Sequence, residues 1–96
     1  MMPATVTAAP VESLGLELAK WLYDYVVGLV DDAHALTIVP RWEAPDTLVL
    51  VNRAARGADV GRLVGRHGAV LNGLRSVARV VGVRHGLRLG VEVAEA

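Results

Sequence analysis

Four consecutive residues in the second half of the chain have types and spacing suited to holding an anion. They are Gly65, Arg66, His67 and Gly68, and helical patterns lie on both sides of them. Backbone N–H groups at the start of a helix lack partners within the helix and carry a partial positive charge. Glycine permits positive φ angles and lets a phosphate–sugar backbone approach closely. Arg66 adds a charge that persists near neutral pH. The segment is therefore a candidate site for a phosphate backbone.

Residue types that would support other chemistry are sparse. The chain has no cysteine, so disulfides and thiolate metal sites are excluded. The three histidines, His34, His67 and His85, lack metal-ligand spacing and a nearby set of carboxylates. Ser13 and Ser76 fall on predicted helices and lack the strand-to-turn context of a nucleophile. We therefore expect no enzymatic activity, no metal and no cofactor.

The net charge of zero conceals an asymmetry between the two halves of the chain. Residues 1–50 contain seven acidic and two basic side chains, whereas residues 51–96 contain eight arginines and three acidic side chains. The halves therefore carry opposite charges, and the basic half contains the glycine-flanked loop. This distribution indicates a localised site for a polyanion, although the arginines could also serve only to solvate a helix.

The hydrophobic pattern predicts one small α+β domain. Residues 1–10 are small and apolar-to-neutral, with prolines at positions 3 and 10, and we expect residues 1–11 to be a disordered tail before a domain over residues 12–96. The first helix should begin near Val11–Ser13 and end at Asp31–Asp32. Strands are expected over 36–42, 47–52 and 87–93, a short helix over 60–64 and a long helix over 69–81. This α-β-β-α-α-β order predicts a three-stranded mixed sheet with three helices on one face.

The first predicted helix has apolar residues on two sides. Its broad stripe predicts a buried face, and the second stripe suggests a further cover, another subunit or incidental exposure. The first stripe is Leu14, Leu18, Trp21, Leu22, Tyr25, Val26 and Leu29, and the second is Leu16, Tyr23 and Val27.

No segment has the composition of a signal peptide or a membrane span. Residues 1–10 contain no Lys or Arg, and charged side chains interrupt the most apolar stretch, Leu14–Val30. We expect a cytoplasmic protein.

The run from Val60 to Gly68 carries a resemblance to a known family. It reads apolar-Gly-basic-apolar-apolar-Gly-basic-x-Gly, and Leu74-Arg75 follows on the next helix. With the predicted element order, this run resembles a type II KH domain, a module in which a GXXG loop clamps the RNA backbone. More narrowly, the chain is similar to the small bacterial single-KH proteins of the KhpA (YlqC) family over about residues 12–94. The longer tail and the histidine at position 67 depart from that pattern.

The resemblance implies a cytoplasmic protein that binds single-stranded RNA and acts as an RNA chaperone. It also implies association with a larger KH-domain partner of the KhpB (Jag) type, a role in cell shape, and a possible homodimer. By position, the clamping loop would be Gly65, Arg66, His67 and Gly68, with Arg62 beside it. Arg62, Arg66 and the amides of His67–Ala69 would hold phosphates, in a groove between the short helix, the loop and the central strand. The remaining RNA-binding residues would be Val60, Leu63, Val64, Ala69 and Val70.

The bases would be bound without a stacking platform, because both tryptophans and both tyrosines lie before residue 43 and phenylalanine is absent. Arg75 and Arg79 either extend the RNA surface or solvate the long helix.

Two other interpretations of the loop remain. Its glycines could serve only as caps in a turn between helices. Alternatively, residues 69–81 could be the recognition helix of a helix-turn-helix module that reads duplex DNA. That module needs only one turn glycine, and it would place Ala69, Val70 and Leu71 where base-reading side chains are expected.

Overall fold

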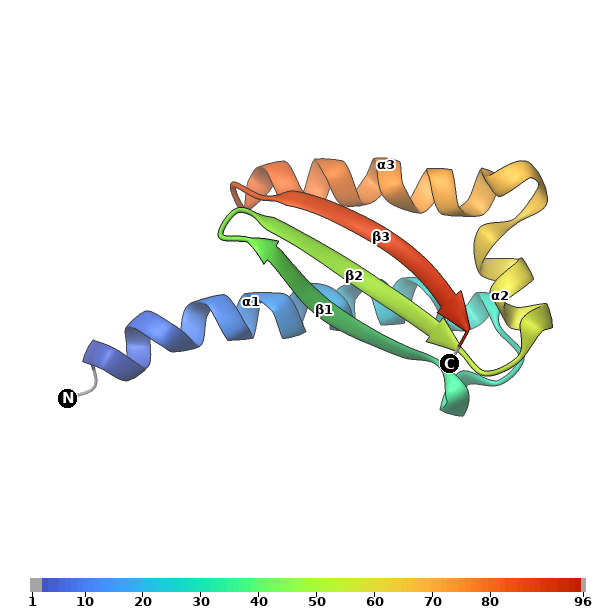
Figure 1. The fold of residues 1–96 in the computed structure, drawn as a ribbon, viewed down its shortest axis with the longest axis horizontal. Helices are drawn as coiled ribbons and strands as arrows, with labels where there is room; N and C mark the ends of the chain where they lie inside the picture. The colour runs from blue at the N-terminus through green and yellow to red at the C-terminus, as the bar shows by residue number, and fades with distance from the viewer. Residues whose placement is uncertain (1–2, 96) are drawn as a thin grey trace.

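A computed structural model describes the backbone of residues 3–95 and the side chains of residues 13–95. Within these residues it contains three α-helices and a three-stranded mixed sheet, in the predicted order (Figure 1). Two short 3-10 segments, η1 (Val27–Leu29) and η2 (Ala33–Ala35), follow the first helix, and a third, η3 (Arg66–Gly68), lies in the candidate loop. The main elements are α1 (Pro3–Val26), β1 (Thr37–Ala44), β2 (Thr47–Ala54), α2 (Gly57–Val64), α3 (Ala69–Arg84) and β3 (Arg88–Glu95).

The central strand of the sheet is β2. It pairs antiparallel with β1 through the turn at Pro45–Asp46, and parallel with β3 after the crossover through α2 and α3. The predicted mixed sheet is therefore confirmed. Both edges of β2 are paired, which fits its apolar character on both faces. Pro40, which has no N–H to donate, lies in an edge strand, β1.

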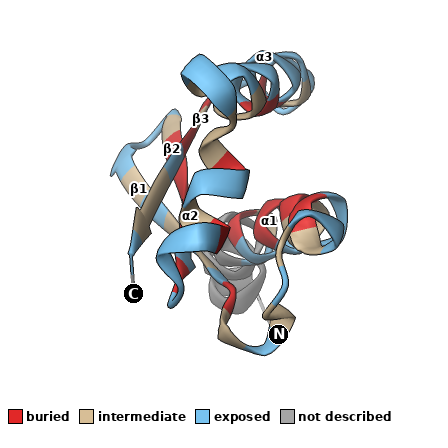
Figure 2. Cartoon of the chain, turned by 90° about the vertical axis from the view of Figure 1, so that its right-hand side faces the viewer, coloured by how far each residue is buried: buried red, intermediate tan, exposed pale blue. Residues whose placement is uncertain are grey.

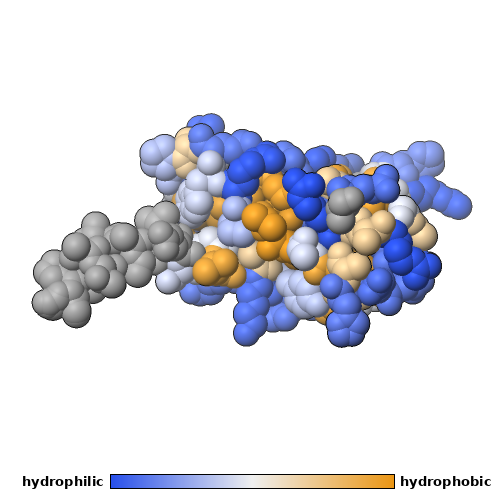
Figure 3. Space-filling model, turned by 60° about the horizontal axis from the view of Figure 1, so that its bottom comes forward, coloured by the Kyte–Doolittle hydropathy of each residue, from blue (hydrophilic) through white to orange (hydrophobic). Residues whose placement is uncertain are grey.

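All three α-helices cover the same face of the sheet (Figure 2). Leu18, Leu22 and Val26 of α1 are buried and pack in one core with residues of β2, α2, α3 and β3. The predicted first stripe of this helix is only partly correct, because Tyr25 and Leu29 are 58% and 40% exposed. In the second stripe, Tyr23 and Val27 pack against the core, whereas Leu16 is exposed. On the face shown in Figure 3, patches of apolar side chains are exposed between hydrophilic ones.

The first helix is longer than the sequence suggested. It begins at Pro3 instead of near Val11–Ser13, so residues 3–11 are helical where an irregular tail was expected. Pro3 suits the first turn of a helix, and the alanines that follow it have the highest helix propensity. Pro10 lies within α1. Residues 1 and 2 lie outside the described residues, and the division of the chain into a tail and a domain stays a prediction.

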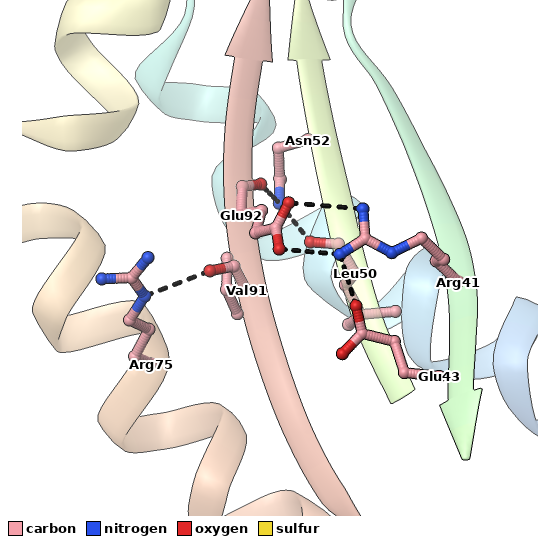
Figure 4. Close-up of polar contacts among 7 residues, drawn as sticks. All are labelled: Arg41, Glu43, Leu50, Asn52, Arg75, Val91 and Glu92. Carbon is pink, nitrogen blue, oxygen red and sulfur yellow. Dashed lines mark hydrogen bonds and ion pairs between the residues drawn. The ribbon is translucent and has the colours of Figure 1, made fainter. Parts of the chain in front are cut away.

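The face of the sheet opposite the helices is covered by a network of charged side chains. Arg41 of β1 reaches across β2 to Glu92 of β3, with an Nη2–Oε2 distance of 2.8 Å, and also pairs with Glu43 at 2.7 Å (Figure 4). Val49 and Val51 of β2 lie in register with Arg41 and Glu92, and both are buried although no helix covers them. The ion pairs therefore shield the middle of this face from water.

The amide of Asn52 ties β2 to β3. Its Nδ2 donates to the carbonyl oxygens of Leu50 and Glu92, each at 3.1 Å, and its side chain is fully buried (Figure 4). The Oδ1 atom of Asn52 is buried without a partner within the described residues.

Gly82 sets how closely α3 packs on β3. A Cβ at this position would lie 2.8 Å from both the carbonyl oxygen of Leu87 and the Cβ of Leu89. The N–H of Leu87 also donates to the carbonyl of Gly82 at 2.8 Å, which closes the turn between the two elements. The position of α3 over the sheet therefore depends on a missing side chain.

We expect Gly82→Ala to lower the free energy of unfolding by about 1–2 kcal/mol, because the new methyl group overlaps β3. Gly73→Ala, on the same helix, is the matched control. A Cβ at Gly73 meets nothing within 4 Å. This substitution should raise the free energy of unfolding by about 0.5–1 kcal/mol through helix propensity alone. Urea unfolding measures both values, and equal effects would contradict the packing described for Gly82.

Candidate nucleic-acid interface

The candidate loop begins where α2 ends, at Gly65. The φ angle of Gly65 is +78°, and its N–H donates to the carbonyl of Gly61 at 2.8 Å. A Cβ at Gly65 would lie 2.5 Å from Cγ2 of Val70 and 2.7 Å from the Val70 nitrogen. Both the backbone angle and the contact with α3 therefore require glycine here. The predicted glycine turn is thus also a close packing point between the two helices.

The next part of the loop projects its side chains into solvent. His67 (φ 56°, ψ 26°) and Gly68 (φ 76°, ψ 14°) are both left-handed, and histidine is among the non-glycine residues enriched in this region. The side chains of Arg66 and His67 are exposed. A Cβ at Gly68 would meet only Asn72, at 3.6 Å, so its conformation and not crowding favours glycine. The loop therefore presents two basic residue types beside an open backbone.

The amides of the loop are not all available to a ligand. The N–H of Gly68 donates to the carbonyl of Gly65 at 3.1 Å, and that of Ala69 donates to the carbonyl of Arg66. Two of the three amides predicted to hold phosphates therefore already donate within the turn, and a phosphate would have to compete with these hydrogen bonds. Within the described residues, the amides of Arg66 and His67 take no part in the turn's hydrogen bonds. These two amides are the ones that the loop offers.

Arg62 is engaged elsewhere. Its Nη1 lies 2.7 Å from Oδ1 of Asp59, and its Nη2 lies 3.1 Å from Oδ2 of Asp31. The structure therefore places the guanidinium between two carboxylates, on the side of α2 that meets the Asp31–Asp32 segment. The sequence predicted that Arg62 lies beside the loop and holds a phosphate. Arg62 does lie on α2 beside the loop, but its guanidinium is already paired with two carboxylates.

Asp59 anchors α2 to the segment that follows α1. It is 1% exposed, and its two carboxylate oxygens accept the N–H groups of Asp31 at 2.9 Å and Asp32 at 3.1 Å. The hydrogen bond from the Asp31 amide lowers the pKa of Asp59 most, burial opposes this, and the Asp32 amide and Arg62 lower the pKa further. The carboxylate is therefore held in its charged form, and it fixes the helix from which the loop leaves.

The apolar residues predicted to touch bases divide into two groups. Leu63 is completely buried in the core, so it supports α2 from below and cannot reach a base, contrary to the prediction. Val60, Val64 and Val70 are partly exposed, and Ala69 is exposed. Only this second group remains open to a ligand, because helical geometry turns Leu63 toward the sheet.

The groove beside α3 runs along β3, and the central strand contributes only Val49 to its lining. The helix-facing side chains of β2 at Leu48 and Leu50 are fully buried and both its edges are paired, so it offers no open wall. The other strand packed against α2 and α3 is β3, whose outer edge pairs with no strand in the described part of the chain. A cavity of about 250 Å³ lies along this edge. It is lined by Val49, Arg75, Arg79, Leu89, Gly90, Val91 and Glu92.

Arg75 and Arg79 bring positive charge to this groove. Nε of Arg75 donates to the carbonyl oxygen of Val91 at 3.1 Å, on the free edge of β3 (Figure 4). Glu92 also lines the groove, but Arg41 compensates its charge. Sequence reasoning left the role of the two arginines open. Their spacing of four residues, off the apolar stripe of α3, was the available signal.

The three histidines do not gather into a metal site among the described residues. His34, His67 and His85 are all exposed, and the described residues hold no group of three side chains arranged to bind a metal ion.

We predict that Asp59 makes the stability of the fold depend on acid pH. Its pKa is lower in the folded chain than the unfolded value of about 4, so its stabilisation is present above about pH 4 and is lost as the pH falls further. Asp59→Asn should lower Tm at neutral pH, and the gap from the parent chain should narrow at low pH. Thermal unfolding from about pH 7 to about pH 2 measures this.

Asp24→Asn, which removes an exposed carboxylate of α1, is the control and should leave Tm nearly unchanged. A gap between Asp59→Asn and the parent chain that stays constant down to the lowest pH would contradict the assignment.

Comparison with known proteins places this geometry in a family. A search of curated proteins gave no match to the chain. A family model described as the KhpA/KhpB KH domain matches residues 19–93, which include the last third of α1, everything from β1 to α3 with the loop, and most of β3. No helix among the described residues is both long enough and apolar enough to cross a membrane. Because the family model matches most of the chain and the fold agrees with it, the chain belongs to the KhpA/KhpB family of KH domains.

Proposed function

We propose that the chain binds single-stranded RNA by clamping its backbone with the loop Gly65–Gly68. RNA binding is the property of the KH family to which the chain belongs. The observation that supports the clamp is the loop's shape, in which two positive-φ glycines bracket the exposed Arg66 and His67. A phosphate at this point would meet the charge of Arg66 and the free amides of Arg66 and His67. Neutralised phosphates supply most sequence-independent affinity.

The bases of such an RNA would lie along α3 and β3. The partly exposed side chains of Val64 and Val70 lie next to the loop, and the free edge of β3 follows. An unpaired strand edge presents N–H and C=O groups that can hydrogen-bond with base edges. The described aromatic side chains, Trp21, Tyr23, Tyr25 and Trp42, lie on α1 and β1. Base recognition here therefore depends on strand-edge polar groups and aliphatic contacts more than on stacking.

Duplex DNA binding by α3 is the alternative function. The first turn of α3 carries Ala69, Val70 and Leu71, and none of these side chains can donate a hydrogen bond to a base edge. No observation in the structure favours this alternative, and it enters the test below as one outcome.

The test is fluorescence anisotropy with labelled single-stranded RNA, single-stranded DNA and duplex DNA over a range of salt. We expect Arg66→Asp with His67→Asp to lower RNA affinity by at least about tenfold, because a phosphate would then meet two negative charges. Aspartate is tolerated at positive φ, so the loop should keep its shape. Circular dichroism would verify the fold.

Lys20→Asp with His34→Asp is the control, because it changes the net charge equally at two exposed positions on α1 and η2. It should leave binding nearly unchanged. Equal losses in both double variants would contradict the clamp, and preferential binding of duplex DNA would favour the helix-turn-helix alternative.

We further propose that the chain acts in the cytoplasm as an RNA chaperone with a second KH domain, from another copy or from a larger KhpB-type partner, in post-transcriptional and cell-shape regulation. One KH module grips only about four nucleotides, so joining two modules raises affinity through effective concentration. A groove of about 330 Å³ between the end of α1 and the start of α3 supports such pairing. Its walls include the exposed apolar side chains of Tyr25, Leu29 and Val77.

Val77→Glu should abolish self-association, because it would bury a carboxylate in an apolar interface. Val83→Glu makes the same change on α3 at a residue that is 72% exposed and lies outside this groove, and it should leave the mass in solution unchanged. Sedimentation equilibrium measures both. A parent chain that is monomeric at all concentrations would refute the homodimer and leave a different partner.

A further inference from the structure

A second cavity lies at the end of α3 that is far from the loop. It has a volume of about 390 Å³ and sits where α3 turns into β3. We call it the far-end pocket. Figure 1 shows this turn at one end of α3 and the loop at the other. The pocket is lined by Thr47, Val49, Arg79, Val83, Leu87, Arg88, Leu89 and Gly90.

The far-end pocket is continuous with the groove along β3. Four residues line both cavities, and Arg79 is the charged one among them. The others are Val49, Leu89 and Gly90. A chain molecule lying in the groove can therefore pass into the pocket without leaving the surface.

The walls of the far-end pocket are apolar and its charged side chains are arginines. Val83 is exposed, Leu87 is half-buried, and Gly90 contributes no side chain to the pocket. The side chains of Arg79 and Arg88 are both exposed. Asp46, next to Thr47, accepts a hydrogen bond from the Thr47 hydroxyl at 3.1 Å and is not among the lining residues.

This combination fits a nucleotide. A flat base can lie against aliphatic walls and the plane of a guanidinium, while its phosphate pairs with an arginine. An uncharged apolar ligand would form no ion pair with the arginines, and a free phosphate would make no contact with the apolar walls. Glu92, which would repel phosphates in the adjoining groove, is paired with Arg41 at 2.8 Å.

We infer that the far-end pocket binds a further nucleotide of the same RNA strand that the loop clamps. The binding site would then extend along the free edge of β3, past the roughly four nucleotides that one loop grips. The 16 residues of α3 separate the two ends by about 24 Å. A strand must therefore be longer than the clamped segment to reach the pocket. The inference rests on the proposed clamp and adds a second point at which the protein binds the same RNA strand.

The test compares the affinities of a labelled four-nucleotide and a labelled ten-nucleotide oligouridine, with an oligoadenine pair as a second probe. The longer RNA offers the loop more positions at which to bind, and this alone raises its affinity. We expect its affinity for the parent chain to exceed that statistical gain by about tenfold. Arg88→Glu and Val83→Glu should each remove this extra gain and leave the affinity for the short RNA unchanged. Val83 is 72% exposed, so its replacement should not perturb the fold.

Arg84→Glu is the matched control. It reverses a charge on the last turn of α3, at an exposed residue that lines neither cavity, and it should keep the extra gain. The inference would be overturned if the longer RNA showed no gain in affinity beyond the statistical one. It would also be overturned if Arg84→Glu and Arg88→Glu lowered the affinity for the longer RNA equally. Failure of the clamp is recognised separately, because the Arg66→Asp and His67→Asp pair would then leave the affinity for the short RNA intact.

Discussion

The missing side chain at Gly65 is the constraint on which the rest of the site depends. It lets the first turn of α3 approach the end of α2, with the space of a Cβ occupied by Val70. The angle between the helices follows from this contact and from the positive φ of the loop. That angle carries α3 over β3, where Gly82 permits an equally close approach at the other end of the helix. Two glycines thus hold α3 along the edge of the sheet.

The charges of the site are arranged around this placement. The buried carboxylate of Asp59 secures α2 to the segment after α1 and also pairs with Arg62. The arginine nearest the loop in the sequence therefore serves the fold, whereas Arg66, Arg75 and Arg79 face the surface. On the far face of the sheet, Arg41 holds Glu92 and removes a repulsive charge from the groove. The result is a basic track from the loop along β3, built from a chain with zero net charge.

Local patterns in the sequence were sufficient to predict the element order, the mixed sheet and the loop. The alternation in Leu87–Val93 and the glycine spacing of the loop are local signals, and the structure agrees with both. The start of α1 was missed because Pro10 looks like a helix entry in isolation. The partners of Arg62 and the burial of Leu63 were also missed, since these depend on contacts between residues far apart in the chain. The part of β3 in the groove wall was missed for the same reason, since it depends on how α3 packs along the edge of the sheet.

The central claim is that RNA contacts the loop and then follows the edge of β3. An NMR titration of the labelled chain with a short single-stranded RNA tests this claim residue by residue. The largest shifts of backbone amides should occur at Arg66 and His67 and continue through residues 89–91 of β3. Shifts confined to the exposed side of α3 around Val80 and Arg84, with the loop amides unmoved, would contradict it.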